Sequence, residues 1–475
     1  VFRYADVQHP EAKFDRAAHH ALAAELEKEC AVLLQNKGAL PLARAAKIAY
    51  IGGFAEKPRY QGGGSSHINA SAVASALDAA RVNGTDVVYA EGFPADRDET
   101  DEAKFAAAVE AARAADAAII FAGLPDSFES EGYDRSHMRL PECQDRLIAR
   151  VAAVQPNTVV VLHNGSPVEC PWAESVNAVL EMYLGGQGVG AAADALLYGD
   201  ANPSGRLPET FPYQLEDNPS HLNFPGDGKN VEYAEGVFVG YRYYDKKKMA
   251  VRWPFGHGLS YTTFEYSNVR VSADVLNDGG TVTVYADIKN TGDRAGREVV
   301  QLYVADRTGT AGRPEKELKG FSKVALEPGE TKTVELSVDA RSLSWYSEAL
   351  GGWYAAPGRY ELLVGHSSRD IRGAAAVEFR TEKLLPFHVD ENTTVGELLA
   401  DPRTASSVRQ MARQFMDTIA PAAEDSADAA KEAVSDEMAR QMMDNMPLRG
   451  LRSFGAFPEG ALERMIADLN AKMAQ

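Results

Sequence analysis

The sequence is poor in cysteine and has no long hydrophobic run. Only three cysteines occur among the 475 residues, and none stands in a Cys-x-x-Cys or Cys/His spacing, which argues against a disulfide scaffold and against a metal site. No stretch of 18 apolar residues is present, nor a basic N-terminal region followed by an apolar run, so neither a membrane span nor a secretion signal is expected. We therefore expect a reducing, cytoplasmic location, with no metal and no other cofactor.

Basic residues are also scarce relative to acidic ones. Lys and Arg number 49 against 68 Asp and Glu, which gives a net charge of −19, and such a charge repels phosphate backbones and anionic lipids. Nucleic acid and membranes are therefore not expected as partners. The composition, with 45% hydrophobic and 25% charged residues, is that of a soluble globular chain, and the length suggests about three domains. The sequence leaves open whether the chain forms a homo-oligomer.

Two common catalytic motifs are missing. Residues 164–167 (Asn-Gly-Ser-Pro) lack the closing glycine of a Gly-x-Ser-x-Gly elbow, so a serine triad is unsupported. The glycine-rich stretch 57–69 matches neither Gly-x-Gly-x-x-Gly nor the Walker pattern. This stretch favours a polyhydroxylated ligand over a phosphate, because sugars require many neutral hydrogen bonds. Its candidate ligand-binding residues are Arg59, Tyr60, Gln61, Ser65 and Ser66.

The chain changes character along its length. From residue 47 to residue 213, short apolar runs alternate with Ala-rich helical patterns, which predicts an α/β domain with a mostly parallel sheet. The remaining segments are expected to be a helical connection (1–46), a long connection rich in Pro, Asn and Gly (214–255), an antiparallel β-sandwich (256–382) and a helical C-terminal extension (383–475).

An acidic loop follows the predicted strand 117–123. Residues 124–135 hold four carboxylates together with two aromatic residues, Phe128 and Tyr133. Open α/β sheets bind ligands beyond the carboxyl ends of their strands, and an apolar wall raises a carboxyl pKa towards neutrality, as a general acid requires. We therefore expect the aromatic side chains to form such a wall around one of the carboxyl groups. A solvated turn is the more common use of an acidic loop.

Seven segments together resemble the second half of a glycoside hydrolase family 3 β-glucosidase. They are ECAVLLQNKGALPL (29–42), PRYQGGGSSHIN (58–69), ESEGYDR (129–135), GRLPETFP (205–212), EGVFVGYRYYD (235–245), WPFGHGLSYTTFEY (253–266) and NMPLRGLRSFGAF (445–457). In that family, a (β/α)-barrel with an aspartate nucleophile precedes a six-stranded α/β sandwich that supplies the general acid/base. A fibronectin type III-like domain follows.

The resemblance also assigns residues. It implies that the acid/base is Glu131, directly before Gly-Tyr-Asp-Arg, with Glu129 as a rival in the same loop. Phe128 is expected to flank the leaving-group subsite, and residues 59–66 to rim the pocket. No Ser-Asp-Trp nucleophile motif and no barrel pattern occurs before residue 22, so residues 1–46 resemble only the connection that leaves the barrel.

The implied function is the acid/base-bearing portion of a retaining β-glucosidase. Its substrates would be β-glucosides or short oligosaccharides, and its partner would be the barrel domain, without which the chain is expected to be inactive. One alternative is a non-catalytic carbohydrate-binding or assembly module that lacks a barrel. Another is a phosphate- or nucleotide-binding protein.

Overall fold

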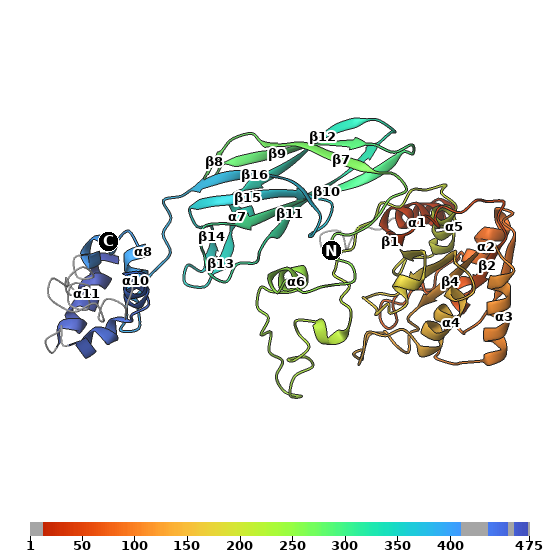
Figure 1. Cartoon of the computed structure of the whole chain (residues 1–475), viewed down its shortest axis with the longest axis horizontal. Helices are drawn as coiled ribbons and strands as arrows, with labels where there is room; N and C mark the ends of the chain where they lie inside the picture. The colour runs from red at the N-terminus through yellow and green to blue at the C-terminus, as the bar shows by residue number, and fades with distance from the viewer. Residues whose placement is uncertain (1–12, 410–435, 455–459, 474–475) are drawn as a thin grey trace, which may run out of the picture. The chain divides into compact units, whose positions relative to one another are not determined.

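The structure, a computed structural model, describes residues 13–409, 436–454 and 460–473. These residues form two compact units. Unit 1 comprises residues 13–344 and 355–381, and holds a six-stranded sheet with its helices and a β-sandwich (Figure 1). Unit 2 comprises residues 345–354 and the described residues after 381. Within these ranges, no helix is both long enough and apolar enough to cross a lipid bilayer.

The first sheet of unit 1 is mostly parallel, as predicted. Its strands run in the order β1-β6-β5-β4-β2-β3, and only β1 is antiparallel to its neighbour. Every residue of β2, β4, β5 and β6 is buried, as a sheet covered on both faces requires. The strands are β1 (Val32–Asn36), β2 (Ile48–Ile51), β3 (Val87–Ala90), β4 (Ala117–Gly123), β5 (Thr158–His163) and β6 (Ala178–Glu181).

Helices cover both faces of this sheet. The chain passes from β2 to β3 in one direction across the sheet and from β3 to β4 in the other, so right-handed crossovers place α2 and α3 on opposite faces. Helices α1 and α2 pack against α5, whereas α3 packs against α4. The helices are α1 (Arg16–Cys30), α2 (Ala76–Val82), α3 (Glu102–Arg113), α4 (Glu142–Ala152) and α5 (Val189–Leu197), with short 3-10 turns at Gly53–Ala55 and Ala173–Ser175.

Strand β1 corrects the expectation that residues 1–46 are only a helical connection. Helix α1 does occupy much of this segment, but Val32, Leu33 and Leu34 are buried in the sheet core, where β1 pairs with β6. A five-residue apolar run is too short for its periodicity to distinguish a strand from a buried helical segment. The α/β domain therefore includes residues from before its predicted start.

The β-sandwich follows the long connection, which contains a 3-10 turn (Leu215–Asp217) and α6 (Tyr241–Lys246). One sheet has the order β11-β10-β15-β16-β8 and the other β12-β9-β7, and their facing side chains form one hydrophobic core. This confirms the predicted sandwich. Its elements are β7 (Phe264–Val271), β8 (Val275–Asn277), β9 (Thr281–Asn290), β10 (Gly296–Asp306), β11 (Glu317–Leu326), β12 (Thr331–Asp339), α7 (Ala340–Leu343), β15 (Gly358–Gly365) and β16 (Ile371–Arg380).

A buried ion pair joins the sandwich to the segment that leaves the α/β domain. Arg206 Nη2 lies 2.9 Å from Glu298 Oε2, and Glu298 is fully buried. Tyr266 donates its hydroxyl to the other carboxylate oxygen at 2.8 Å, and His366 Nδ1 lies at the same distance from it. Several partners therefore compensate the buried charge, as its desolvation requires.

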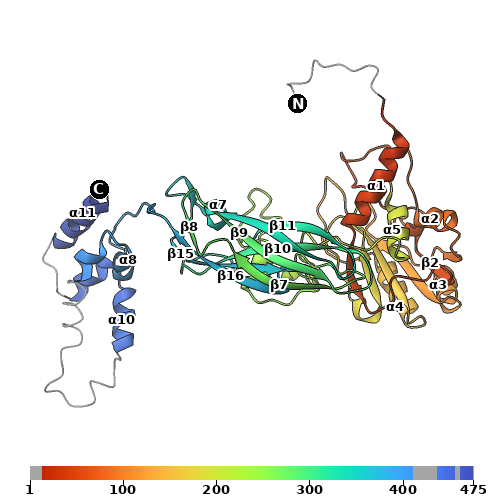
Figure 2. The ribbon, with the colours of Figure 1, turned by 90° about the horizontal axis from the view of Figure 1, so that it is seen from above.

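Unit 2 combines a short hairpin with helices, of which Figure 2 labels α8, α10 and α11. Its core includes Val395, Leu398, Met443, Leu462 and Leu469. The predicted helical extension is confirmed where it is described, although residues 410–435, 455–459 and 474–475 of it lie outside the described residues. The elements are β13 (Trp345–Ser347), β14 (Gly352–Tyr354), α8 (Val395–Ala400), α10 (Asp436–Asp444), a 3-10 segment (Leu448–Phe454) and α11 (Ala461–Met473).

Candidate active site

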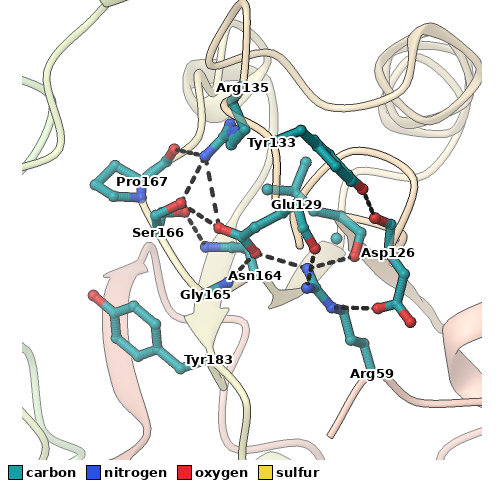
Figure 3. Close-up of polar contacts among 12 residues, drawn as sticks. Arg59, Asp126, Glu129, Tyr133, Arg135, Asn164, Gly165, Ser166, Pro167 and Tyr183 are labelled. Atoms are coloured by element: carbon teal, nitrogen blue, oxygen red, sulfur yellow. Dashed lines mark hydrogen bonds and ion pairs between the residues drawn. The ribbon is translucent and has the colours of Figure 1, made fainter. Parts of the chain in front are cut away.

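Three loops meet at one edge of the parallel sheet. The glycine-rich segment 57–69 lies beyond β2, the acidic loop 124–135 follows β4, and residues 164–167 follow β5. Strands β2, β4 and β5 are neighbours in the sheet, so their carboxyl ends bring these loops together. Figure 3 shows the side chains from the three loops that converge on Glu129.

Glu129 is held from three directions. Arg59 Nη1 and the Gly165 N–H each donate to Glu129 Oε2 at 2.7 Å, and the Ser166 hydroxyl donates to Oε1. Arg59 Nη2 donates to the backbone carbonyl of Glu129 at 2.6 Å. The Glu129 side chain is only 17% exposed. Because charge-assisted hydrogen bonds are the strong ones, this carboxylate anchors the acidic loop to both neighbouring loops.

A second guanidinium completes the anchor. Arg135 Nη1 donates to Ser166 Oγ at 2.8 Å and to the Pro167 carbonyl at 3.0 Å, and it lies 3.9 Å from Glu129 Oε1 (Figure 3). The acidic loop is therefore fixed near both ends of the segment 129–135. The sequence analysis did not identify this contact.

Glu131, in contrast, is exposed. Its Oε2 accepts the Ser65 N–H at 2.5 Å, and hydrogen bonds from the Ser65 side chain and N–H lower the pKa of Glu131 below its ordinary value. The expectation that Phe128 and Tyr133 form an apolar wall around a carboxyl group is therefore wrong for Glu131. Tyr133 is 48% exposed and donates its hydroxyl to the Asp126 carbonyl, and Phe128 packs against His137 instead.

The glycines of segment 57–69 pack closely against the acidic loop. A Cβ on Gly63 would lie 2.5 Å from Ser130 Oγ, and one on Gly64 would lie 2.5 Å from Glu131 Cβ. Gly64 also has a φ of +88°, which other residues rarely adopt. The glycines are thus explained by close packing, and the facing carboxyl groups of Asp126 and Glu131 do not suit a phosphate.

The other predicted binding residues divide into packed and exposed ones. Arg59 is buried and committed to Glu129. Tyr60 is half-buried, and its hydroxyl accepts a hydrogen bond from Gln61 Nε2 at 3.0 Å. Ser65 and Ser66 are exposed beside Glu131. The structure therefore brings the serines and Glu131 to one surface and places Arg59 beneath it.

Comparison with known proteins shows where these loops belong. Residues 31–261 match the glycosyl hydrolase family 3 C-terminal domain, and residues 298–368 match the fibronectin type III-like domain. The chain carries a glycosyl hydrolase family 3 C-terminal domain followed by a fibronectin type III-like domain. The thermostable β-glucosidase B of Acetivibrio thermocellus is 43% identical over 99% of this chain, and an exo-α-(1→6)-L-arabinopyranosidase of Bifidobacterium breve is 39% identical over 98%.

Solved structures of the family give the same result. The β-glucosidase of Bifidobacterium adolescentis is 43% identical, with a TM-score of 0.79 over 84% of this chain and 59% of that one. The β-glucosidase DesR of Streptomyces venezuelae, solved with D-glucose, is 32% identical, with a TM-score of 0.72 over 79% of this chain and 62% of that one. The chain spans about 62% of the Acetivibrio relative and 61% of the Bifidobacterium breve relative.

Behind the anchor, this family 3 domain buries a group of acids. Glu181 is fully buried at the end of β6, where Asn164 Nδ2 and the Tyr183 N–H donate to its carboxyl group; burial raises its pKa well above the ordinary value. Tyr183 donates its hydroxyl to Glu209 at 3.0 Å, and burial raises the pKa of Glu209 to about 7. Burial also raises the pKa of Glu27 to about 8.

Residues 164–167 were considered only as a serine elbow, and the hydrogen bonds of Gly165 and Ser166 to Glu129 were not predicted. The available signal was their position just after the apolar run 159–162, because adjacent parallel strands end at one edge of the sheet. Among residues 13–409, 436–454 and 460–473, no group of three or more His, Cys, Asp or Glu side chains is arranged to hold a metal ion.

We predict that Glu129→Gln loosens the acidic loop. The neutral amide loses charge-assisted hydrogen bonds from Arg59 and Ser166, so amide hydrogen exchange over residues 126–133 should accelerate by about 10- to 100-fold. Asp126→Asn is the control. Its carboxylate lies 3.4 Å from Arg59 Nε but is 71% exposed, and because exposed ion pairs contribute little, this change should alter exchange little. Equal protection in both variants would contradict the anchor.

A second prediction concerns pH. Burial raises the folded-state pKa of Glu27 from 4.5 to about 8. The stability that protonation of Glu27 contributes is therefore fully present below about pH 4.5 and is lost as the pH rises through about 8. Glu27→Gln removes this titration, so the free energy of unfolding should fall less between pH 5 and pH 8, by roughly 2–4 kcal/mol. Denaturant titrations at both pH values test this, with the exposed Glu25→Gln on the same helix as control. An unchanged slope in Glu27→Gln would refute the assignment.

Proposed function

We propose that this chain is the proton-donating portion of a retaining β-glucosidase, with Glu131 as the general acid/base. The supporting observation is the contrast between the two candidate carboxyl groups. Glu129 accepts hydrogen bonds from Arg59, Gly165 and Ser166 and is committed to them. Glu131 stands exposed on the loop that Glu129 fixes, where a glycosidic oxygen can reach it. Glu129 is accordingly a positioning residue in this proposal.

The nucleophile is proposed to come from a (β/α)-barrel domain. A retaining glycosidase needs two carboxyl groups about 5 to 5.5 Å apart, and the relatives are longer than this chain. The connection before the sandwich also exposes large apolar side chains, including Leu222, Tyr233 and Val237. Such side chains are typical of a surface that another domain or chain covers.

A covering domain would also supply what the Glu131 environment lacks. A general acid works best with a pKa near the working pH, whereas the exposed Glu131 has a lowered pKa. Closing a second surface over the loop would remove water from Glu131 and raise its pKa. In this proposal the barrel supplies the nucleophile and also excludes water from Glu131.

The proposed substrates are β-glucosides or short oligosaccharides. Named relatives include both β-glucosidases and exo-α-(1→6)-L-arabinopyranosidases at similar identity. We favour the glucoside because every solved relative described above is named a β-glucosidase. Assaying aryl β-glucosides beside aryl α-L-arabinopyranosides decides between the two sugars.

We also propose a cytoplasmic location. All three cysteines, Cys30, Cys143 and Cys170, are free thiols, and free thiols persist in a reducing compartment. Fractionation of cells that produce the native protein would test this proposal.

The purified chain alone is expected to be folded but inactive. General acid catalysis by itself typically contributes about 10² to 10⁴-fold, too little for measurable turnover of a glycoside without a positioned nucleophile. An assay of the monodisperse chain with an aryl β-glucoside tests this expectation. Clear activity would show that the nucleophile lies within these 475 residues.

Glu131→Gln should abolish hydrolysis of substrates with poor leaving groups and spare activated aryl glucosides, which need little proton assistance. We suggest fusing the chain to the part of the Acetivibrio thermocellus relative that it does not cover. The expected loss on poor leaving groups is about 10² to 10⁴-fold, with a flattened alkaline limb of the pH profile.

Glu129→Gln is the matched comparison. It should lower activity on both classes of substrate, because it disturbs the loop and not the proton donor. If only Glu129→Gln abolishes hydrolysis of substrates with poor leaving groups while sparing activated aryl glucosides, then Glu129 is the proton donor and Glu131 is not. If neither the fusion nor the native protein hydrolyses any glycoside, the non-catalytic carbohydrate-binding module becomes the better explanation.

A further inference from the structure

A cavity of about 490 Å³ lies on the Arg135 side of the Glu129 anchor. Its walls come from the acidic loop, from residues 166–167, from residues 208–219 and from the α6 region. None of the residues that surround Glu131, such as Gly64 and Ser65, lines it. The cavity is therefore separate from the surface proposed for catalysis, and its volume lies within the range of small-molecule sites, about 300 to 1,000 Å³.

Unsatisfied polar atoms are concentrated in this wall. Arg135 Nη2, His137 Nδ1 and Thr210 Oγ1 are buried and make no hydrogen bond within the described part of the chain, and all three residues line the cavity. Thr210 is only 7% exposed. A buried polar atom without a partner destabilises the fold, so three around one cavity indicate a ligand that supplies both donors and acceptors.

The rest of the wall is firmly held. Tyr241 accepts the Leu318 N–H at 2.7 Å, and its ring stacks on Phe255 with centroids 4.6 Å apart. Glu209, on the same wall, accepts the Tyr183 hydroxyl. A largely apolar lining with a few fixed polar groups is the usual composition of a preformed ligand site.

The charges in the wall indicate an uncharged ligand. Arg135 lies 3.9 Å from Glu129, and Arg242 lies 3.4 Å from Glu317. Both carboxylates are shared with another cation, Glu129 with Arg59 and Glu317 with Arg313, while Glu209 adds a carboxyl group to the same wall. A ligand charge of either sign would therefore meet a like charge, and burying it would be costly. Hydroxyl groups, in contrast, can donate to and accept from the three unsatisfied atoms.

We propose that this cavity is a binding site for a neutral monosaccharide, separate from the glycone site of the proposed hydrolase. Because Arg135 and Ser166 belong both to the cavity wall and to the Glu129 anchor, a sugar bound there contacts the support of the acidic loop. The site goes beyond the proposed function, since sugar binding here requires no barrel and no hydrolysis.

The test is a titration of the purified chain with D-glucose, followed by calorimetry and saturation-transfer NMR. Saturable binding is expected. Thr210→Val should weaken it by about 2- to 10-fold, the range for one lost hydrogen bond, whereas Thr158→Val, at a buried threonine outside the cavity, should leave it unchanged.

Two further variants distinguish the cavity from the rest of the surface. Val239→Trp fills the rim of the cavity and should abolish glucose binding, whereas Val231→Trp, at a similarly exposed valine outside the lining, should not. Glu131→Gln should retain binding. Binding that is lost in Glu131→Gln and kept in Val239→Trp would place the sugar at the loop tip and overturn the proposal, as would no saturable binding up to the solubility limit of glucose.

Discussion

The candidate site depends on one carboxylate, that of Glu129. Loops that follow two other strands, β2 and β5, reach it through Arg59, Gly165 and Ser166, and Arg135 of its own loop adds a second guanidinium. Without this convergence the acidic loop would be an exposed, highly charged segment. The anchor allows a loop to present Glu131 at a defined place while leaving that side chain itself open. Glu129 thus holds the loop in place, and Glu131, two residues later, remains exposed.

The sequence predicted the architecture well because the α/β domain follows simple periodicity. Strands β2, β4 and β5 are apolar runs bounded by turn residues, and the structure places them in the middle of a six-stranded sheet. Strand β1 escaped prediction because its partner, β6, lies about 145 residues further on, and no local pattern records such a pairing. The same reason hides the contact of Ser166 with Glu129.

The pattern could not separate Glu129 from Glu131, since both stand in one short acidic segment. Burial separates them, and it comes from Arg59 and Ser166, which follow other strands and hold only Glu129. The pattern also suggested an apolar environment for the acid from Phe128 and Tyr133. In the folded chain Phe128 contacts His137, while Tyr133 turns towards the Asp126 carbonyl. Sequence proximity of aromatic and acidic residues therefore did not amount to contact.

The buried pair of Arg206 and Glu298 has a consequence for how such proteins can be recombined. The two residues belong to different domains. Arg206 lies in the segment that leaves the α/β domain, and Glu298 lies in β10 of the larger sandwich sheet. Replacing the sandwich by one without an acid at this place would leave Arg206 buried without its partner, at a cost of about 3–5 kcal/mol. An exchanged sandwich therefore has to bring its own buried acid opposite Arg206 if the junction between the two domains is to be kept.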